Sequence, residues 1–196
     1  MQDEELIRII LHGNGELYAE IVERYQSKLY RTAYHYTQNI EDARDLTQEI
    51  FIKAYNSLAG FKRGSSFSTW LYRIAVNHCI DWSRKKKPRQ HEVDTVVDLY
   101  HKEGSPEDHF LRLESAAEIQ GAVRSLPEIY STVLLLYYFE DFTPREIADI
   151  LDTSKRTVET RLFRGRKLLR ESLQSRWDGG EGNDLPTQQG RVAQLR

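Results

Sequence analysis

The segment TPREIADILDTSKRTVETRLFRGRKLLR, residues 143–170, predicts two helices separated by a tight turn. Thr143 and Glu146 have the spacing of a capping box, which begins a short helix. The small side chain of Ala148 allows a second helix to approach closely. Asp152 lies where the turn is needed, and aspartate tolerates the left-handed backbone conformation of such turns. Together these features predict a helix-turn-helix.

The second of these helices has an apolar side and a basic side. Its inward-facing positions are Val158, Leu162, Leu168 and Leu169. Its exposed positions are Lys155, Arg156, Thr157, Glu159, Thr160, Arg161 and Arg164. All but Glu159 can donate to phosphates or base edges, and Glu159 can accept from a cytosine amine. An ordinary helical hairpin with a basic face is the alternative. The agreement of cap, turn, core anchors and charge favours DNA binding.

The whole chain is nearly neutral, but its charge is unevenly distributed. Its 196 residues carry a formal net charge of −2. Five cations fall within residues 84–89 and seven within 155–170, while the stretch between these runs is mostly acidic. Two basic patches can contact a polyanion at two places. Either run alone is more simply explained as a solvated helix face.

Apolar residues at helical spacing predict further helices, and strand signals are almost absent. The expected helices cover residues 16–36, 40–58, 69–87 and 113–126, with one more starting at Pro127. Ser68 is the expected cap of the third. A mostly irregular linker is expected over residues 88–111 and a disordered tail over 178–196. The predicted fold class is therefore all-α, with two small helical domains joined by a flexible linker.

Several classes of protein and site are disfavoured by the sequence. The single cysteine, Cys79, excludes an internal disulfide and a cysteine-based zinc site. The N-terminus lacks the pattern of a signal peptide, and no window approaches the roughly 18 apolar residues of a membrane span. We therefore expect a soluble, cytoplasmic protein. DGGEGND, residues 178–184, lacks the ligand spacing of a calcium loop. No recognised metal-site spacing joins His91, Glu92, Asp94 and His101, which are better explained as polar residues of the linker. We expect no metal and no cofactor.

Three motifs in their order and spacing carry a resemblance to a known family. They are DLTQEIFIKAY at 45–55, FSTWLYRIAVN at 67–77 and TVETRLFRGRKLL at 157–169. The chain resembles the extracytoplasmic-function sigma factors, which direct bacterial RNA polymerase to promoters. The resemblance implies sigma region 2 over residues 1–87 and a linker over 88–114. It also implies sigma region 4 over residues 115–177, before the tail at 178–196.

The resemblance also implies three interaction surfaces and no enzymatic activity. By this resemblance, one surface binds the two largest subunits of core RNA polymerase. The residues that match this surface are Asp42, Asp45, Leu46, Gln48, Glu49 and Ile52. An acidic and amide face can dock a basic partner helix, although composition alone equally fits a solvated face. An anti-sigma protein is a further implied partner.

Two surfaces are implied for promoter DNA. The −10 surface, whose loop at 60–68 holds a flipped base, comprises Phe61, Lys62, Arg63, Gly64, Ser65, Ser66, Phe67, Asn77, Asp81, Arg84 and Lys85. The −35 surface comprises Thr143, Lys155, Arg156, Thr157, Thr160, Arg161, Arg164 and Lys167. For Trp70 and Trp82 the sequence fits both a position in the core and a position at the DNA-binding edge of the helix. Two alternatives are a stand-alone helix-turn-helix regulator and a nuclease. The nuclease is disfavoured because no carboxylates are clustered for metal-dependent catalysis.

Overall fold

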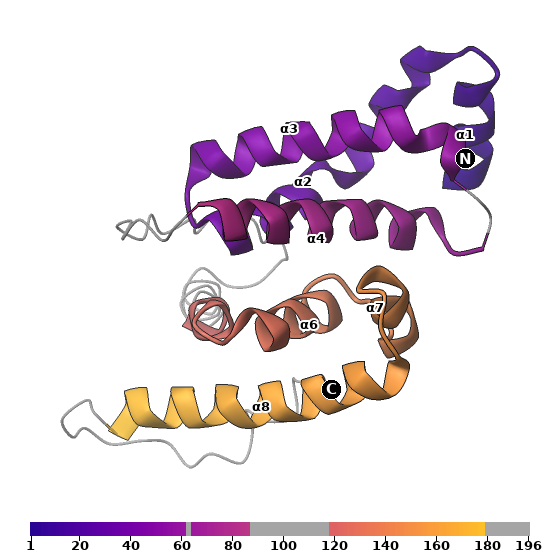
Figure 1. The fold of residues 1–196 in the computed structure, drawn as a ribbon. Coiled ribbons are helices and arrows are strands. Elements are labelled where there is room, and N and C mark those ends of the chain that lie inside the picture. The colour runs from indigo at the N-terminus through magenta and orange to yellow at the C-terminus, as the bar shows by residue number, and fades with distance from the viewer. Residues whose placement is uncertain (62–63, 87–117, 179–196) are drawn as a thin grey trace, which may run out of the picture. The chain divides into compact units, whose positions relative to one another are not determined.

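The computed structural model describes residues 1–61, 64–86 and 118–178, and all regular structure in these ranges is helical (Figure 1). The helices belong to two compact units. The all-α prediction is confirmed. The expected linker at 88–111 and tail at 178–196 lie outside the described residues, apart from the single position Asp178. No helix in the described ranges combines the length and hydropathy needed to span a bilayer.

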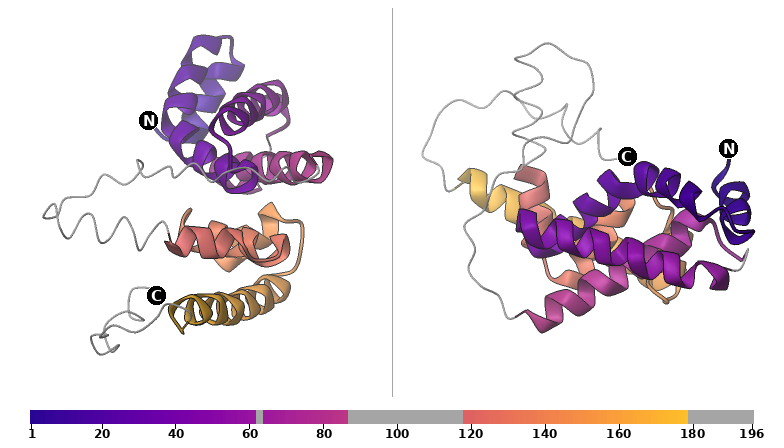
Figure 2. Two further views of the ribbon diagram at one scale, coloured as in Figure 1. Left: turned by 90° about the vertical axis from the view of Figure 1, so that its left-hand side faces the viewer. Right: turned by 90° about the horizontal axis from the view of Figure 1, so that it is seen from above.

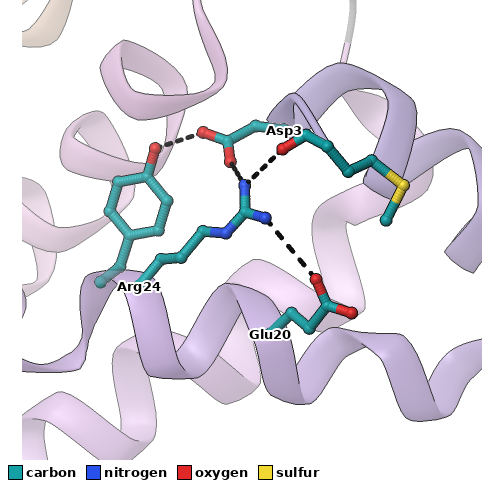
Figure 3. A network of polar contacts seen from close by, with 5 residues as sticks. Asp3, Glu20 and Arg24 are labelled. Atoms are coloured by element: carbon teal, nitrogen blue, oxygen red, sulfur yellow. Dashed lines mark hydrogen bonds and ion pairs between the residues drawn. The ribbon is translucent and has the colours of Figure 1, made fainter.

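The first unit begins with helix α1, Asp3–Leu11, which was not predicted. Its acidic first turn suits the positive end of the helix dipole. Helix α2, Tyr18–Thr37, follows a short 3-10 helix, Gly15–Leu17. Arg24 of α2 ties the two helices together, since its Nη1 donates to Asp3 Oδ1 at 2.8 Å (Figure 3).

The same carboxylate has a second partner on α2. The Tyr25 hydroxyl donates to Asp3 Oδ2, while Glu20 Oε2 lies 3.6 Å from Arg24 Nη2 (Figure 3). Burial, reinforced by this hydrogen bond, raises the pKa of Tyr25. The N-terminal helix is therefore held by a compact polar network as well as by buried Leu6, Ile7 and Ile10.

Helices α2, α3 (Ile40–Ser57) and α4 (Phe67–Lys85) form a three-helix bundle in which each contacts the other two (Figure 2). A short 3-10 helix, Leu58–Gly60, ends α3. The apolar residues that predicted this helix form a stripe along the inward side of α3. Its fully buried members are Ala43, Leu46, Ile50, Ala54 and Leu58. They pack with a matching set from the other two helices: Ile21, Leu29, Ala33, Leu71, Tyr72, Ala75 and Val76.

Side-chain caps define where α3 and α4 begin. Asn39 Oδ1 accepts from the Asp42 backbone N–H at 3.0 Å, and Ser66 Oγ accepts from the Thr69 N–H at 3.2 Å. The prediction that Ser68 caps α4 was wrong by two residues. Ser68 lies inside the first turn, and its hydroxyl is 2.9 Å from that of Ser66. Ser66 has the extended backbone that an N-cap requires.

An aromatic cluster fixes the loop that precedes α4. The ring centroids of Phe61, Phe67 and Trp70 lie 5.5–5.6 Å from one another, and Tyr25 adds an edge-on contact with Phe67 at 5.7 Å. Such separations are those of favourable aromatic pairs. Phe67 is 1% exposed and forms the centre of the cluster. The two ends of the loop are thus anchored to the same core.

The second unit contains helix α6, Glu128–Tyr138, and helix α8, Lys155–Asp178; residues 118–124 are also helical. The two named helices approach closely at Gly165. A Cβ atom placed on this glycine would lie 3.2 Å from Leu134 Cδ1 and 3.4 Å from Tyr130 Cβ. Close approach was expected at Ala148, and the contribution of Gly165 was not anticipated. A larger side chain at this position would push the helices apart.

The helix-turn-helix segment has the local backbone that was predicted. Helix α7 covers Pro144–Ile150, and α8 begins at Lys155. Between them Asp152 has a φ of 49°, in the left-handed region. The Thr153 N–H donates to the Ala148 carbonyl at 3.0 Å, which satisfies one of the last carbonyls of α7.

Replacing Ser66 with Ala removes the observed cap of α4. We expect the free energy of unfolding to fall by about 1 kcal/mol, because an N–H of the first turn loses its acceptor. Replacing Ser68 with Ala is the matched control and should change it by less than about 0.5 kcal/mol. Urea denaturation followed by circular dichroism measures both. A larger loss for Ser68→Ala than for Ser66→Ala would contradict the assignment.

Candidate protein and nucleic-acid interfaces

The outward side of α3 is polar and largely open to solvent. Asp45, Gln48, Glu49 and Ile52 are exposed, Ile52 to 61%. They recur at three- and four-residue intervals, so they share one face of the helix. This face lies opposite the buried stripe that includes Leu46 and Ile50.

Two members of the predicted polymerase-binding set differ from the rest. Leu46 is only 1% exposed and belongs to the core, so it is not available to a partner. A leucine adjacent to Asp45 falls on the other side of the helix because neighbouring residues are about 100° apart. Asp42 is half-buried, and its Oδ1 pairs with Lys86 Nζ at 2.5 Å. The exposed surface therefore consists mainly of the other four residues.

A shallow apolar groove adjoins the end of this face. It lies between α2 and α3 and is lined by Tyr18, Val22, Phe51, Ile52 and Tyr55, among others. The Tyr18 hydroxyl donates to the Phe51 carbonyl at 2.8 Å. Its ring meets that of Tyr55 edge-on with centroids 4.9 Å apart. Burial raises the pKa of the Tyr18 phenol. Ile52 thus belongs both to the polar face and to the rim of the groove.

The predicted −10 loop presents backbone and small side chains to solvent. Gly64 and Ser66 are exposed, while Phe61 and Ser65 are half-buried. Among the described residues that are not its chain neighbours, none has an atom within 4 Å of a Cβ placed on Gly64, so space remains around it. Lys62 and Arg63 lie outside the described residues. Phe67 is part of the core and does not face solvent, because the aromatic cluster encloses it.

One side of α4 carries the remaining −10 candidates. Asn77, Asp81, Arg84 and Lys85 are all exposed. Their spacing of four, seven and eight residues from Asn77 places them on one face. Arg73, one turn before Asn77, is also exposed.

The two tryptophans of this helix have different surroundings. Trp70 belongs to the aromatic cluster beside the loop and is half-buried. Trp82 is also half-buried, and Lys86 Nζ lies 4.6 Å from its ring centroid. A cation over an aromatic face is attracted by the ring quadrupole. Neither tryptophan is therefore wholly buried in the core.

Helix α8 presents the predicted −35 candidates to solvent unequally. Lys155, Arg156, Thr160, Arg164 and Lys167 are exposed, whereas Thr157 and Arg161 are half-buried; Thr143, before α7, is exposed. The Thr160 hydroxyl donates to the Arg156 carbonyl at 2.9 Å, which leaves its oxygen as an acceptor. Val158, Leu162 and Leu169 are buried as predicted, and Leu168 is half-buried.

Metal binding and cysteine reactivity have little support in the described part of the chain. In these ranges, no group of three or more His, Cys, Asp or Glu side chains is arranged so that it could hold a metal ion. The residues His91, Glu92, Asp94 and His101 lie outside the described ranges. Cys79 is buried, and burial raises the pKa of its thiol, so the reactive thiolate is disfavoured. Phe163 on α8 is 67% exposed and was not singled out from the sequence.

Comparison with known proteins identifies the family. Residues 21–89 match the model of sigma-70 region 2, and residues 116–169 match that of sigma-70 region 4. The ECF RNA polymerase sigma factor SigW of Bacillus subtilis is 37% identical over 182 residues, covering 88% of this chain and 97% of that protein. The ECF RNA polymerase sigma-E factor of Escherichia coli K12 is 31% identical over 183 residues, covering 89% and 95%.

Solved structures of low sequence identity share the fold. CnrH, solved in complex with the cytosolic domain of CnrY, has a TM-score of 0.67 at 23% identity, covering 88% of this chain and 97% of that one. The sigma factor RpoE of Bartonella quintana, solved with the anti-sigma factor NepR, has a TM-score of 0.59 at 18% identity, covering 80% and 96%. With both sigma regions matched in order and close relatives matched almost end to end, the chain belongs to the extracytoplasmic-function sigma factors of the sigma-70 family.

Proposed function

We propose that this sigma factor binds core RNA polymerase through the exposed face of α3, opens promoters with the 60–68 loop and α4, and reads the −35 element with α8. The observation that carries the proposal is the division of α3 into two sides. Its apolar side is fully buried, while Asp45, Gln48, Glu49 and Ile52 are exposed. A folded helix that keeps two acids, an amide and an isoleucine on one open face is suited to a partner surface.

The chemistry of this face specifies its partner. Two carboxylates and a carboxamide can accept from arginine or lysine side chains, and Ile52 supplies an apolar contact beside them. The face therefore suits a basic and apolar helix of core polymerase. Leu46 is left out of this surface, and Asp42 is placed at its edge because it pairs with Lys86.

The loop and α4 are suited to opened DNA. Unstacking a DNA step costs about 1.4 kcal/mol, and a protein offsets this by holding the freed base. Phe61 and Trp70 give half-exposed rings beside the loop, and a base can stack on such a ring. Gly64 leaves room for close approach of a base to the backbone. Lys62 and Arg63 would neutralise phosphates.

Asn77 is the proposed contact at the point of melting. Its exposed amide has both a donor and an acceptor, so it can replace hydrogen bonds that a base loses on leaving its pair. Arg84 and Lys85 continue the same face and supply phosphate contacts. Asp81 lies between Asn77 and these two cations and can accept from a cytosine amine.

The C-terminal helix α8 is the proposed reader of the −35 element. Arg156, Thr160 and Arg164 are exposed along one side of its N-terminal half. Arg161 is half-buried, so fewer of its rotamers are open and its guanidinium is better ordered for reading a base. Lys155 and Lys167 would position the helix through phosphates.

Three further proposals follow from membership of the family. We place region 2 at residues 1–87, the linker at 88–114 and region 4 at 115–177, ahead of the tail. Because this factor acts on bacterial RNA polymerase, it works in the cytoplasm. We also propose an anti-sigma protein as its inhibitor, since the solved complex of Bartonella RpoE contains one.

Promoter opening that depends on core enzyme is the main test. With core RNA polymerase, the unmodified chain should produce permanganate-reactive thymines at the −10 element of a target promoter. Without core it should produce none and bind promoter DNA weakly in a gel shift. Asn77→Ala should bind core with unchanged affinity but open fewer promoters. Tight, specific DNA binding by the isolated chain without core-dependent opening would instead indicate a stand-alone regulator.

The two sides of α3 should respond differently to truncation. Gln48→Ala should weaken binding to core polymerase by about 1–2 kcal/mol while changing the free energy of unfolding by less than about 0.5 kcal/mol. Leu46→Ala should cost about 2–5 kcal/mol of stability, because it leaves a cavity in the core. Fluorescence titration with core enzyme and urea denaturation give the two quantities. Undiminished core binding by Gln48→Ala would remove this residue from the surface.

Arg161→Ala tests base reading by α8. Loss of a base contact should lower transcription from a promoter with an intact −35 element by an amount equivalent to about 1–3 kcal/mol. On a promoter with a scrambled −35 element the variant should match the unmodified chain. Multiple-round transcription in vitro on the two templates measures this. An equal defect on both templates would make Arg161 a phosphate or folding residue.

A further inference from the structure

A three-residue bridge joins α4 to the exposed face of α3. His78 Nε2 lies 2.7 Å from Glu49 Oε2, and His78 Nδ1 lies 2.7 Å from Lys53 Nζ. His78 is on α4, directly after Asn77, whereas Glu49 and Lys53 are one turn apart on α3. The side chain of His78 is 13% exposed and that of Glu49 is 59% exposed. The imidazole is therefore enclosed while the carboxylate remains open to solvent.

The partners of the ring determine which nitrogen holds the hydrogen. An ammonium group can only donate, so Nδ1 must accept from Lys53 and carry no hydrogen. The hydrogen of the neutral ring then lies on Nε2 and is donated to Glu49. One neutral imidazole thus donates a hydrogen bond to the Glu49 carboxylate and accepts one from the Lys53 ammonium group. The position of the ring fixes the direction of both bonds. A residue without both a donor and an acceptor cannot do this.

We infer that His78 is a positioning residue that orders Glu49 and Lys53 for binding to core polymerase, an inference that rests on the proposed function. Lys53 is exposed one residue beyond Ile52, and Glu49 is adjacent to Gln48. His78 contacts only one oxygen of Glu49, so the carboxylate still has Oε1 to offer to a donor from the partner. Ordering both side chains in the free protein reduces the entropy that association would otherwise cost.

Stability of the bundle does not require this bridge. Helices α3 and α4 are already joined by fully buried apolar residues, including Ile50, Ala54, Leu71 and Ala75. The bridge lies at the surface, where single polar pairs contribute little to folding. Glu49 and Lys53 also have the spacing of a direct helical ion pair. Hydrogen bonds to a histidine on a different helix restrict the directions in which the Glu49 and Lys53 side chains can point.

Two substitutions of similar size test the role of the ring. His78→Gln keeps one donor and one acceptor, whereas His78→Leu keeps the volume and removes both. We expect His78→Leu to bind core RNA polymerase about 3- to 10-fold more weakly and His78→Gln to stay within about twofold of the unmodified chain. Competition for fluorescently labelled core enzyme measures the affinities, and thermal unfolding is recorded for each variant.

The coupling between His78 and Glu49 gives the decisive readout. If His78 acts through Glu49, His78→Leu should weaken binding little further in a chain that already carries Glu49→Gln. Lys53→Met removes the other end of the bridge while keeping its aliphatic length, and it should also weaken binding. This variant leaves α4 unchanged, so it tests the bridge even if His78→Leu folds poorly.

A second polar link provides the control. Arg24→Gln breaks the contact between α1 and α2 at Asp3, which has a similar distance and involves no residue of α3. It should leave core affinity within about twofold. Equal, unmodified affinity for His78→Leu and His78→Gln would overturn the inference. Failure of the unmodified chain to bind core enzyme would instead overturn the proposed function.

Discussion

The structure depends on the burial of one side of α3 against α2 and α4. Leu46 and Ile50 are fully buried at the centre of this contact, and Ala43 and Ala54 allow the helices to approach on either side. Each large aliphatic side chain that leaves water contributes about 1.5–3 kcal/mol. Because this stripe determines the rotation of α3 about its axis, it also determines which residues of the helix face solvent. The proposed polymerase surface is therefore a direct consequence of core packing.

The same dependence extends to the loop and helix that are proposed to contact promoter DNA. Phe67 is buried in an aromatic cluster with Phe61 and Trp70, and Ser66 caps the helix that begins there. These contacts hold both ends of the 60–68 loop, and Gly64 and Ser66 between them are exposed to solvent. A site supported in this way needs less ordering when a base enters it. Core residues and contact residues consequently alternate within a few positions of the chain.

Membership of a family and the roles of individual residues rest on different grounds. The matches to both sigma regions cover most of the described helices, and they establish the class of protein. They do not distinguish Leu46 from Gln48, although both lie in the same motif. That distinction comes from burial, since only an exposed side chain can meet a polymerase subunit or DNA. Neither the family match nor the burial of single residues reveals the His78 bridge, because it is formed by side chains from two helices.

Local sequence patterns were enough to predict the helical class, the approximate extent of α2, α3, α4 and α6, and the helix-turn-helix with Asp152 in its turn. These features depend on apolar periodicity and local backbone preference, which are properties of neighbouring residues. The sequence also pointed to the family through three motifs at the expected separations. Helix α1 was missed, and Ser68 was chosen as the cap in place of Ser66. Either serine fits the local pattern, and the choice depends on how Phe67 enters the aromatic cluster.

Tertiary packing determines which motif residues reach solvent and which lie within the core. Leu46 and Phe67 were placed on interaction surfaces, yet both are buried because the bundle encloses their side of the helix. The tight contact at Gly165 and the bridge from His78 to Glu49 and Lys53 join residues at least 25 positions apart. Such pairs leave no local signal in the sequence. They exist because helices that are distant along the chain pack side by side, and packing depends on the shape of all the side chains together.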